Sequence, residues 1–134
     1  MTYSFKDAAN AMVIKEMECG EGIRVQFTPF SSCLGVVSRK GDLLTGIHLV
    51  EVDIQGQFND EKANAVKDKI NGCDEWFFVG FVTDWASGNT KDQVDIIKTV
   101  PKQKNSVNLG DGVYGAKWEF NELAYLKAPK YVKL

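Results

Sequence analysis

SSCLGVVSRKGDLLTGIHL, residues 31–49, holds two runs of apolar and β-branched residues separated by the polar sequence RKGD. Such runs on either side of a glycine-containing turn predict a β-hairpin, because glycine accepts the positive φ that tight turns require. We place the turn at Lys40-Gly41, with strands over 33–38 and 43–52. This turn puts Cys33 directly opposite His48, the only histidine of the chain.

Directly opposed residues of a hairpin point to the same face, with Cβ atoms about 4.5–5.5 Å apart. The predicted register also pairs Gly35 with Gly46, which lie on the face of Cys33 and His48. The opposite face carries side chains suited to a core, namely Leu34, Val36, Thr45 and Ile47. The hairpin therefore predicts a thiol and an imidazole side by side, above a floor of two glycines on which a substrate can rest.

A thiol beside an imidazole is the arrangement of nucleophilic cysteine catalysis. The imidazole of His48 would take the proton of Cys33, lower the pKa of the thiol and later protonate the leaving nitrogen. Backbone amides at the tight turn Ser31-Ser32-Cys33 are candidates to hold the oxyanion. A third group usually orients the imidazole; Thr28 is the first candidate and Ser31 the second.

The same two residues also have a purely structural interpretation. Cysteine is often buried as a small hydrophobic residue, and a lone histidine frequently belongs to a core. In that case Cys33 and His48 perform no chemistry.

Further strands are predicted outside the hairpin. Alternation or continuous apolar runs indicate strands over 11–18, 23–30, 75–85 and 113–120. The run WFFVGFV within 75–85 is typical of a central strand that is covered on both faces, and it is too short to cross a bilayer.

Two helices are predicted. Residues 59–71 begin at a capping residue, Asn59 or Asp60. Thr90 and Gln93 form the T-x-x-Q pattern of a capping box that opens a helix over 91–100. The order of elements predicts an α+β fold, in which two helices pack on a mostly antiparallel mixed sheet, within a single domain spanning 1–134.

Composition excludes several classes of protein. With 44% hydrophobic and 25% charged residues and a net charge of −2, the chain has the profile of a globular protein without a basic footprint for nucleic acid. No run of lysine and arginine indicates a membrane surface, and no secretory signal is visible. Three cysteines without a C-x-x-C and one histidine argue against zinc. We interpret Cys19 and Cys73 as structural or incidental, and free thiols in a reducing compartment are the simplest interpretation of the three cysteines.

Around Cys33 and His48 the sequence resembles the cysteine-dependent glutamine deamidases, a superfamily that includes the catalytic domain of cytotoxic necrotizing factor, Burkholderia lethal factor and the chemoreceptor deamidase CheD. The resemblance rests on CLGVVSRKGDLLTGIHL, a cysteine-strand-turn-strand-histidine unit that follows the turn FSSC. It covers about residues 23–50. Two positions depart from the family pattern: Ser32 replaces the usual glycine, and the nearest threonine, Thr28, lies one position closer to the cysteine.

The resemblance implies a fold, an activity and a set of roles. It implies a sandwich like that of CheD and cytotoxic necrotizing factor, with Cys33 as nucleophile and His48 as general base and acid. The reaction that the resemblance implies is hydrolysis of a glutamine side-chain amide to glutamate and ammonia, without a metal or organic cofactor. Several members orient the histidine with a threonine six positions before the cysteine; here that position is Phe27, and Thr28 is the nearest threonine.

We therefore expect a bacterial enzyme or effector whose partner is a protein that presents an accessible glutamine, with no nucleic acid or membrane partner. A monomer is favoured. The expected location is the cytoplasm, or export as an effector without a classical signal peptide. Two alternatives stay open: a non-catalytic binding or regulatory module on the same scaffold, and another thiol amidohydrolase or a transglutaminase.

Overall fold

The computed structural model describes residues 3–134 and has 43% strand and 18% helix, which confirms the α+β prediction. Strands outnumber helices, and most neighbouring strands run antiparallel. The strands are β1 (Lys6–Asp7), β2 (Glu18–Gly22), β3 (Arg24–Gln26), β4 (Leu34–Lys40), β5 (Leu43–Leu49), β6 (Val52–Asp53), β7 (Gly56–Gln57), β8 (Glu75–Gly80), β9 (Val107–Asn108), β10 (Tyr114–Glu119), β11 (Glu122–Lys127) and β12 (Lys130–Lys133). The helices are α1 (Asp60–Ile70), α2 (Val82–Ser87) and α3 (Lys91–Ile97).

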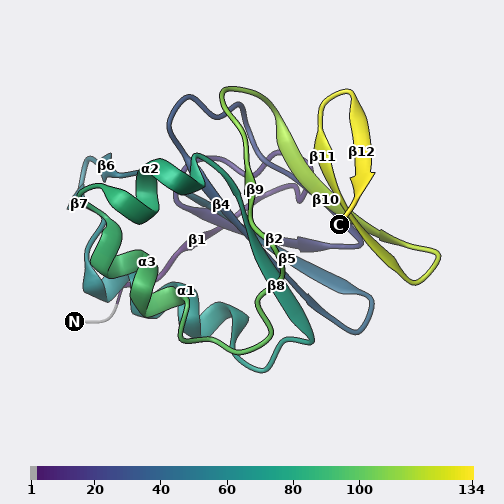
Figure 1. Ribbon diagram of the computed structural model, residues 1–134, viewed down its shortest axis with the longest axis horizontal. Helices are drawn as coiled ribbons and strands as arrows, with labels where there is room; N and C mark the ends of the chain where they lie inside the picture. Colours follow the sequence, from purple (N-terminus) through teal and green to yellow (C-terminus); the bar gives the residue numbers. More distant parts are fainter. Residues whose placement is uncertain (1–2) are drawn as a thin grey trace.

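Two sheets and a layer of helices make up the fold (Figure 1). A six-stranded sheet has the order β1-β2-β5-β4-β8-β9, and a four-stranded sheet has the order β12-β11-β10-β3. The pairs β1-β2 and β8-β9 are parallel, and the others in these sheets are antiparallel. Strands β4 and β5, which carry the predicted site, lie at the centre of the larger sheet.

Each face of the six-stranded sheet covers its own core. On one face, Leu34 and Val36 pack with side chains of α1 and α3; we call this the helix-side core. On the other face, Cys33 and Val37 pack with side chains of the four-stranded sheet; we call this the sheet-side core. The alternation of strand side chains between two buried layers explains why β4 and β8 carry few polar residues.

The hairpin of β4 and β5 forms, but its predicted register is wrong. The two turn residues are Gly41 and Asp42, and Lys40 pairs with Leu43. Gly41 has φ of +61°, whereas Asp42 has no positive φ. This pattern suits a type II′ turn, which needs glycine at its first central position. The predicted turn would have required a positive φ at lysine, so the chain moves the turn by one residue.

Three other predicted elements differ from the structure. Residues 11–17 form a loop with a single bridge at Ile14, and the strand begins only at Glu18. The strand predicted over 75–85 ends at Gly80, and the short helix α2 follows, so three helices form where two were predicted. Thr90 is the N-cap residue of α3, but its side chain donates to the carbonyl of Trp85 (2.7 Å) and does not cap the helix.

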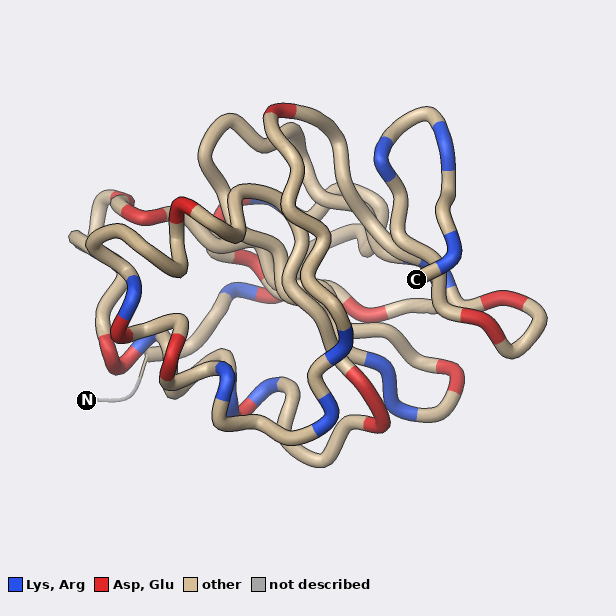
Figure 2. Tube along the Cα trace, viewed as in Figure 1, with Lys and Arg blue, Asp and Glu red and all other residues tan. Residues whose placement is uncertain are grey.

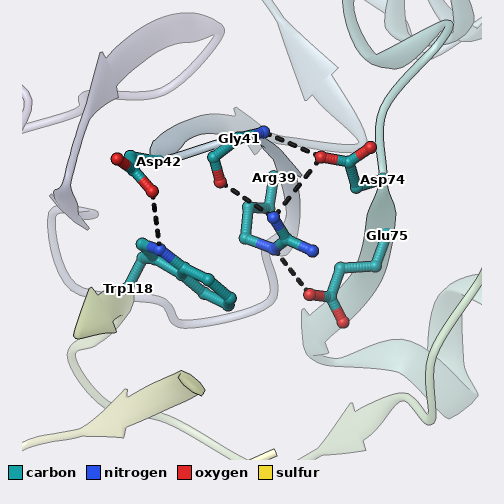
Figure 3. A network of polar contacts seen from close by, with 6 residues as sticks. All are labelled: Arg39, Gly41, Asp42, Asp74, Glu75 and Trp118. Atoms are coloured by element: carbon teal, nitrogen blue, oxygen red, sulfur yellow. Dashed lines mark hydrogen bonds and ion pairs between the residues drawn. The ribbon is translucent and has the colours of Figure 1, made fainter. Parts of the chain in front are cut away.

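One polar network ties the two sheets together at the turn end of the hairpin (Figure 3). Arg39 donates through Nε to Glu75 (2.6 Å) and through Nη1 to the carbonyl of Gly41 (2.8 Å). Its guanidinium also lies 4.1 Å from the ring centroid of Trp118 in β10. The side chains of Arg39 and Glu75 are 17% and 14% exposed. We call these residues the Arg39 network.

Charges of both signs are interspersed over the chain, as Figure 2 shows, and lysines border the edge strand β12 at Lys130 and Lys133. The sheet edges are short: β1 and β9 have two residues each. Within residues 3–134, none of the helices has the length and apolar character needed to span a bilayer.

Candidate functional site

Cys33 and His48 lie on the same face of the six-stranded sheet. His48 is paired with Gly35, two residues after Cys33. The two residues are therefore diagonal neighbours and not a directly opposed pair. Diagonal neighbours are about 7–8 Å apart, with their Cβ atoms somewhat closer, whereas the Cβ atoms of opposed residues are about 4.5–5.5 Å apart. The observed partner of His48 lies two residues from the predicted one. Because side chains alternate with a period of two, this shift increases the separation of Cys33 and His48 but leaves both side chains on the same face.

The imidazole of His48 is held through one ring nitrogen. Nδ1 lies 2.9 Å from the carbonyl oxygen of Ile14 and 3.3 Å from Oγ1 of Thr28. A carbonyl oxygen only accepts hydrogen bonds, so Nδ1 carries the proton and Nε2 carries the lone pair. His48 is completely buried, and Nε2 has no hydrogen-bond partner among the described residues.

Of the two predicted orienting residues, the structure brings only one to His48. Thr28 lies beside Nδ1, although its hydroxyl also approaches the carbonyl of Ile14 (3.4 Å). Ser31 is exposed and makes no hydrogen bond with His48 in the described part of the chain. The shortest contact of the imidazole is to the backbone of Ile14, which sequence patterns did not reveal because residues 11–18 were interpreted as a strand.

Cys33 closes the turn that precedes β4 and is 3% exposed. Burial raises the pKa of its thiol above the ordinary value of 9.0, and the backbone amides of Ser32 and Ser31 act in the opposite direction. Burial likewise lowers the pKa of His48, which the hydrogen bond that Nδ1 donates to the carbonyl of Ile14 partly offsets. Both shifts favour the uncharged forms, a thiol at Cys33 and a neutral imidazole at His48.

The turn Ser31-Ser32-Cys33 offers unpaired backbone donors. None of its three amides donates to a backbone or side-chain acceptor in the described chain, while the carbonyl of Ser32 accepts from the indole Nε1 of Trp85 (2.9 Å) and that of Cys33 accepts from Phe81 (3.1 Å). The amides of Ser31 and Ser32 are close enough to the sulfur of Cys33 to lower its pKa. This arrangement resembles a small anion-binding turn.

The predicted open floor of Gly35 and Gly46 is wrong. Both glycines are buried. A Cβ atom at Gly35 would lie 3.0 Å from Cε2 of Phe27, and a Cβ at Gly46 would lie 3.3 Å from Cε1 of the same ring. The glycines therefore make room for aromatic rings of the sheet-side core and not for a substrate.

A groove of about 720 Å³ borders the site at Thr28 and Pro29. Its far wall is the hairpin of β6 and β7, whose Val52 is 64% exposed and Ile54 103% exposed. The hairpin stands on Lys62 of α1, which is 3% exposed. The Nζ atom of Lys62 reaches three oxygens of the hairpin: Gln57 O at 3.1 Å, Gly56 O at 3.4 Å and Asp53 Oδ1 at 3.4 Å.

The described residues contain no group of three or more histidine, cysteine, aspartate and glutamate side chains placed to hold a metal ion. Cys19 and Cys73, which were interpreted as structural, are buried free thiols of the helix-side core. Burial raises the pKa of Cys19 to about 11.

Comparison with known proteins shows distant structural similarity but no match in sequence. No family model matches the chain, and no curated protein matches it in sequence. Among solved structures, the C-terminal domain of CNFy from Yersinia pseudotuberculosis is similar over 90% of this chain and 53% of that one, with 11% sequence identity and a TM-score of 0.36.

Proposed function

We propose that this protein is a cysteine-dependent amidohydrolase that converts the side-chain amide of a protein-bound glutamine to glutamate. Cys33 is the nucleophile and His48 the general base and acid. The observation that supports this most strongly is the environment of His48. Nδ1 is held by Ile14 and Thr28, while Nε2 is buried on the face of Cys33 and has no hydrogen-bond partner in the described part of the chain. A histidine oriented through one nitrogen with the other left free is suited to proton transfer.

The proposed reaction starts from the neutral pair. Nε2 of His48 takes the proton of Cys33 as the sulfur attacks the carboxamide carbon and forms a carbon–sulfur bond. His48 then passes the proton to the leaving nitrogen, the carbon–nitrogen bond breaks, and ammonia departs from a thioester. A water molecule, deprotonated by His48, hydrolyses the thioester to glutamate and restores the thiol. The carbonyl of Ile14 stabilises the imidazolium that forms in each half of the reaction.

The negative charge on the carboxamide oxygen needs donors in each tetrahedral intermediate. The amides of Ser31, Ser32 and Cys33 have no backbone acceptor in the described chain, and those of Ser31 and Ser32 lie beside the reacting sulfur. Fixed backbone donors of this kind stabilise an oxyanion without reorganisation. We assign the oxyanion site to this turn.

The partner in this proposal is a protein with an accessible glutamine, and the chemistry requires no cofactor. The proposed setting is the bacterial cytoplasm, or a target cell that the protein reaches as an exported effector. The groove beside Thr28 and Pro29 has room for a polypeptide segment.

Ammonia release from casein, used as a generic glutamine-rich substrate, tests the proposal together with mass spectrometry of the product. We expect release by the wild type and none by Cys33→Ser or His48→Ala, while Cys73→Ser retains wild-type activity. Equal release by Cys33→Ser and wild type would contradict the proposal.

Two other outcomes have their own signatures. Incorporation of a fluorescent primary amine into casein, with ammonia still released but without conversion of glutamine to glutamate, would identify a transglutaminase, because the amine then attacks the thioester in place of water. The burial of both Cys33 and His48 favours a non-catalytic module as the second candidate. A binding module would be indicated if the wild type neither releases ammonia from casein nor incorporates the fluorescent amine, and if Cys33→Ser binds a partner protein as tightly as the wild type.

A further inference from the structure

The ring of Phe30 lies against the candidate site. Its centroid is 4.7 Å from that of His48 and 5.1 Å from that of Tyr114, and the residue is 2% exposed. Phe30 is only three positions before Cys33 and packs in the same sheet-side core. It therefore belongs to the layer in which the thiol and Nε2 of His48 lie.

Two glycines make the space that this ring fills. A Cβ atom at Gly80 would lie 2.6 Å from Cδ2 of Phe30, and a Cβ at Gly35 would lie 3.1 Å from its Cζ. Gly35 is the residue paired with His48, and Gly80 pairs with Leu34 in the neighbouring strand. The ring thus occupies a slot over bare backbone, directly beside the imidazole.

This slot explains why the reactive atoms are hidden. Cys33 is 3% exposed, His48 is fully buried, and an unpaired Nε2 in an apolar layer is costly. We propose that residues 29–32 form a strap that closes the site with the ring of Phe30, and that a glutamine side chain enters by displacing this ring. The inference rests on the function proposed above and adds a gating step to it.

The strap is fastened at few points. The amide of Phe30 donates to the carbonyl of Gly112 (2.7 Å), and the amide of Gly112 donates back (3.2 Å). At its other end, the carbonyl of Ser32 accepts from Trp85 (2.9 Å). Pro29 has no amide hydrogen, and Ser31 and Ser32 are exposed. A segment with so few backbone bonds can open without unfolding the sheets.

The position of the strap also connects the site to the groove. Pro29, its first residue, lines the groove together with Thr28. Displacement of Phe30 would join the groove to Cys33 and His48, so a polypeptide in the groove gains access to both. When the strap closes again over a substrate, the amides of Ser31 and Ser32 return beside the sulfur. The gate and the oxyanion turn are therefore the same segment.

Alkylation of the native protein by iodoacetamide tests the gate without depending on catalysis. The rate at each cysteine is measured by peptide mass spectrometry and divided by the rate in the urea-unfolded chain. We expect Cys33 of the wild type to be strongly protected, and its rate to level off at high reagent concentration because strap opening becomes limiting. Phe30→Ala should reduce the protection of Cys33 on the order of tenfold or more, with Cys19 and Cys73 unchanged.

A second variant leaves the core intact. Gly112→Ala places a side chain at a φ of +155° that suits glycine, and so weakens the bridge to Phe30. Like Phe30→Ala, Gly112→Ala should reduce the protection of Cys33 from alkylation. Phe78→Ala is the matched control, since Phe78 is equally buried but packs in the helix-side core, where Cys19 and Cys73 also lie; it should not raise the alkylation rate of Cys33 selectively.

The gate is refuted if Cys33 of the folded wild type reacts as fast as in the unfolded chain, or if Phe30→Ala accelerates all three cysteines equally. Ammonia release from casein by the same variants separates this inference from the proposed function. If no protein releases ammonia in a way that depends on Cys33, the proposed enzymatic function is wrong, while the alkylation result on the gate still holds. Normal release with no protection of Cys33 overturns the gate alone.

Discussion

The candidate site depends on His48, because it is the only histidine of the chain and the two nitrogens of its ring have different surroundings. Nδ1 is hydrogen-bonded to the backbone of Ile14, and Nε2 has no hydrogen-bond partner within residues 3–134. Burial also separates its titration from that of an ordinary histidine. Both properties lead to predictions at this scale.

The stability of the protein should decrease in mild acid. Because burial lowers the pKa of His48 below 6.5, the unfolded chain binds a proton as pH falls through 6.5 while the folded protein does not. The free energy of unfolding therefore decreases with falling pH, until the pH passes the lower pKa of the folded state. One proton gives a slope of at most about 1.4 kcal/mol per pH unit.

Urea unfolding between about pH 5 and pH 8 measures this slope. His48→Gln is the comparison, since it leaves the chain without a histidine. We expect the slope in the wild type to be absent from the variant. Parallel pH dependence in the two proteins would mean that His48 is not the group that titrates.

Thr28 should matter less to catalysis than its sequence position suggests. Its hydroxyl is 3.3 Å from Nδ1 of His48, whereas the carbonyl of Ile14 is at 2.9 Å and stays in any side-chain variant. Thr28→Val should lower kcat for ammonia release by less than about tenfold, the worth of one neutral hydrogen bond. Thr45→Val, in the same hairpin but without contact to His48, is the control. A loss of about a hundredfold or more would make the hydroxyl the main orienting group.

At the scale of elements, the hairpin of β4 and β5 shows what local patterns can and cannot predict. Two β-branched runs around RKGD were enough to predict its strands and the shared face of Cys33 and His48. The register depended on which turn position Gly41 takes, and its φ of +61° at the first position moved the pairing. The local sequence indicates that a turn forms here. It does not show whether the turn residues are Lys40-Gly41 or Gly41-Asp42, because that depends on which register pairs the two strands better.

The hairpin of β6 and β7 should depend on the buried Lys62 beneath it. Lys62→Met keeps the apolar stem but removes the ammonium that binds three hairpin oxygens. We expect faster hydrogen exchange at Gln55 and Gln57 and a free energy of unfolding lower by about 1–3 kcal/mol, the worth of charged hydrogen bonds. Lys69→Met, on an exposed position of α1, should leave both unchanged. Unaltered exchange in Lys62→Met would show that the hairpin is held by other contacts.

At the scale of the whole molecule, the Arg39 network joins the two sheets (Figure 3). Arg39→Met leaves Glu75 half-buried without its 2.6 Å partner and should lower the free energy of unfolding by about 1–3 kcal/mol. Arg24→Met is the control, because its pair with Glu119 has side chains 50% and 35% exposed and should contribute about 1 kcal/mol or less. Denaturant unfolding measures both. Equal effects would mean that the network contributes no more than a surface pair.

The arrangement of sheets was the part of the fold that sequence patterns did not supply. Alternation in β3 and β10 predicted strands, and the fold class followed from the order of elements. That Phe27 and Phe30 cover Gly35 from a second layer depends on contacts between segments far apart in sequence, which a local period does not encode. For the same reason the floor predicted at Gly35 and Gly46 is filled, and Ile14, a backbone partner of His48, was not foreseen.

The short edges of both sheets bear on how this chain behaves at high concentration. An exposed strand edge is a template on which other chains can add, as in amyloid growth. Here the larger sheet ends in the two-residue strands β1 and β9, and the smaller one ends in β3 and in β12, with Lys130 and Lys133 at the two ends of β12. These edges offer few unpaired backbone groups to a neighbouring molecule, and the longest of them, β12, carries lysines at both ends. The protein should therefore resist aggregation through its strands even when the strap over the site is open.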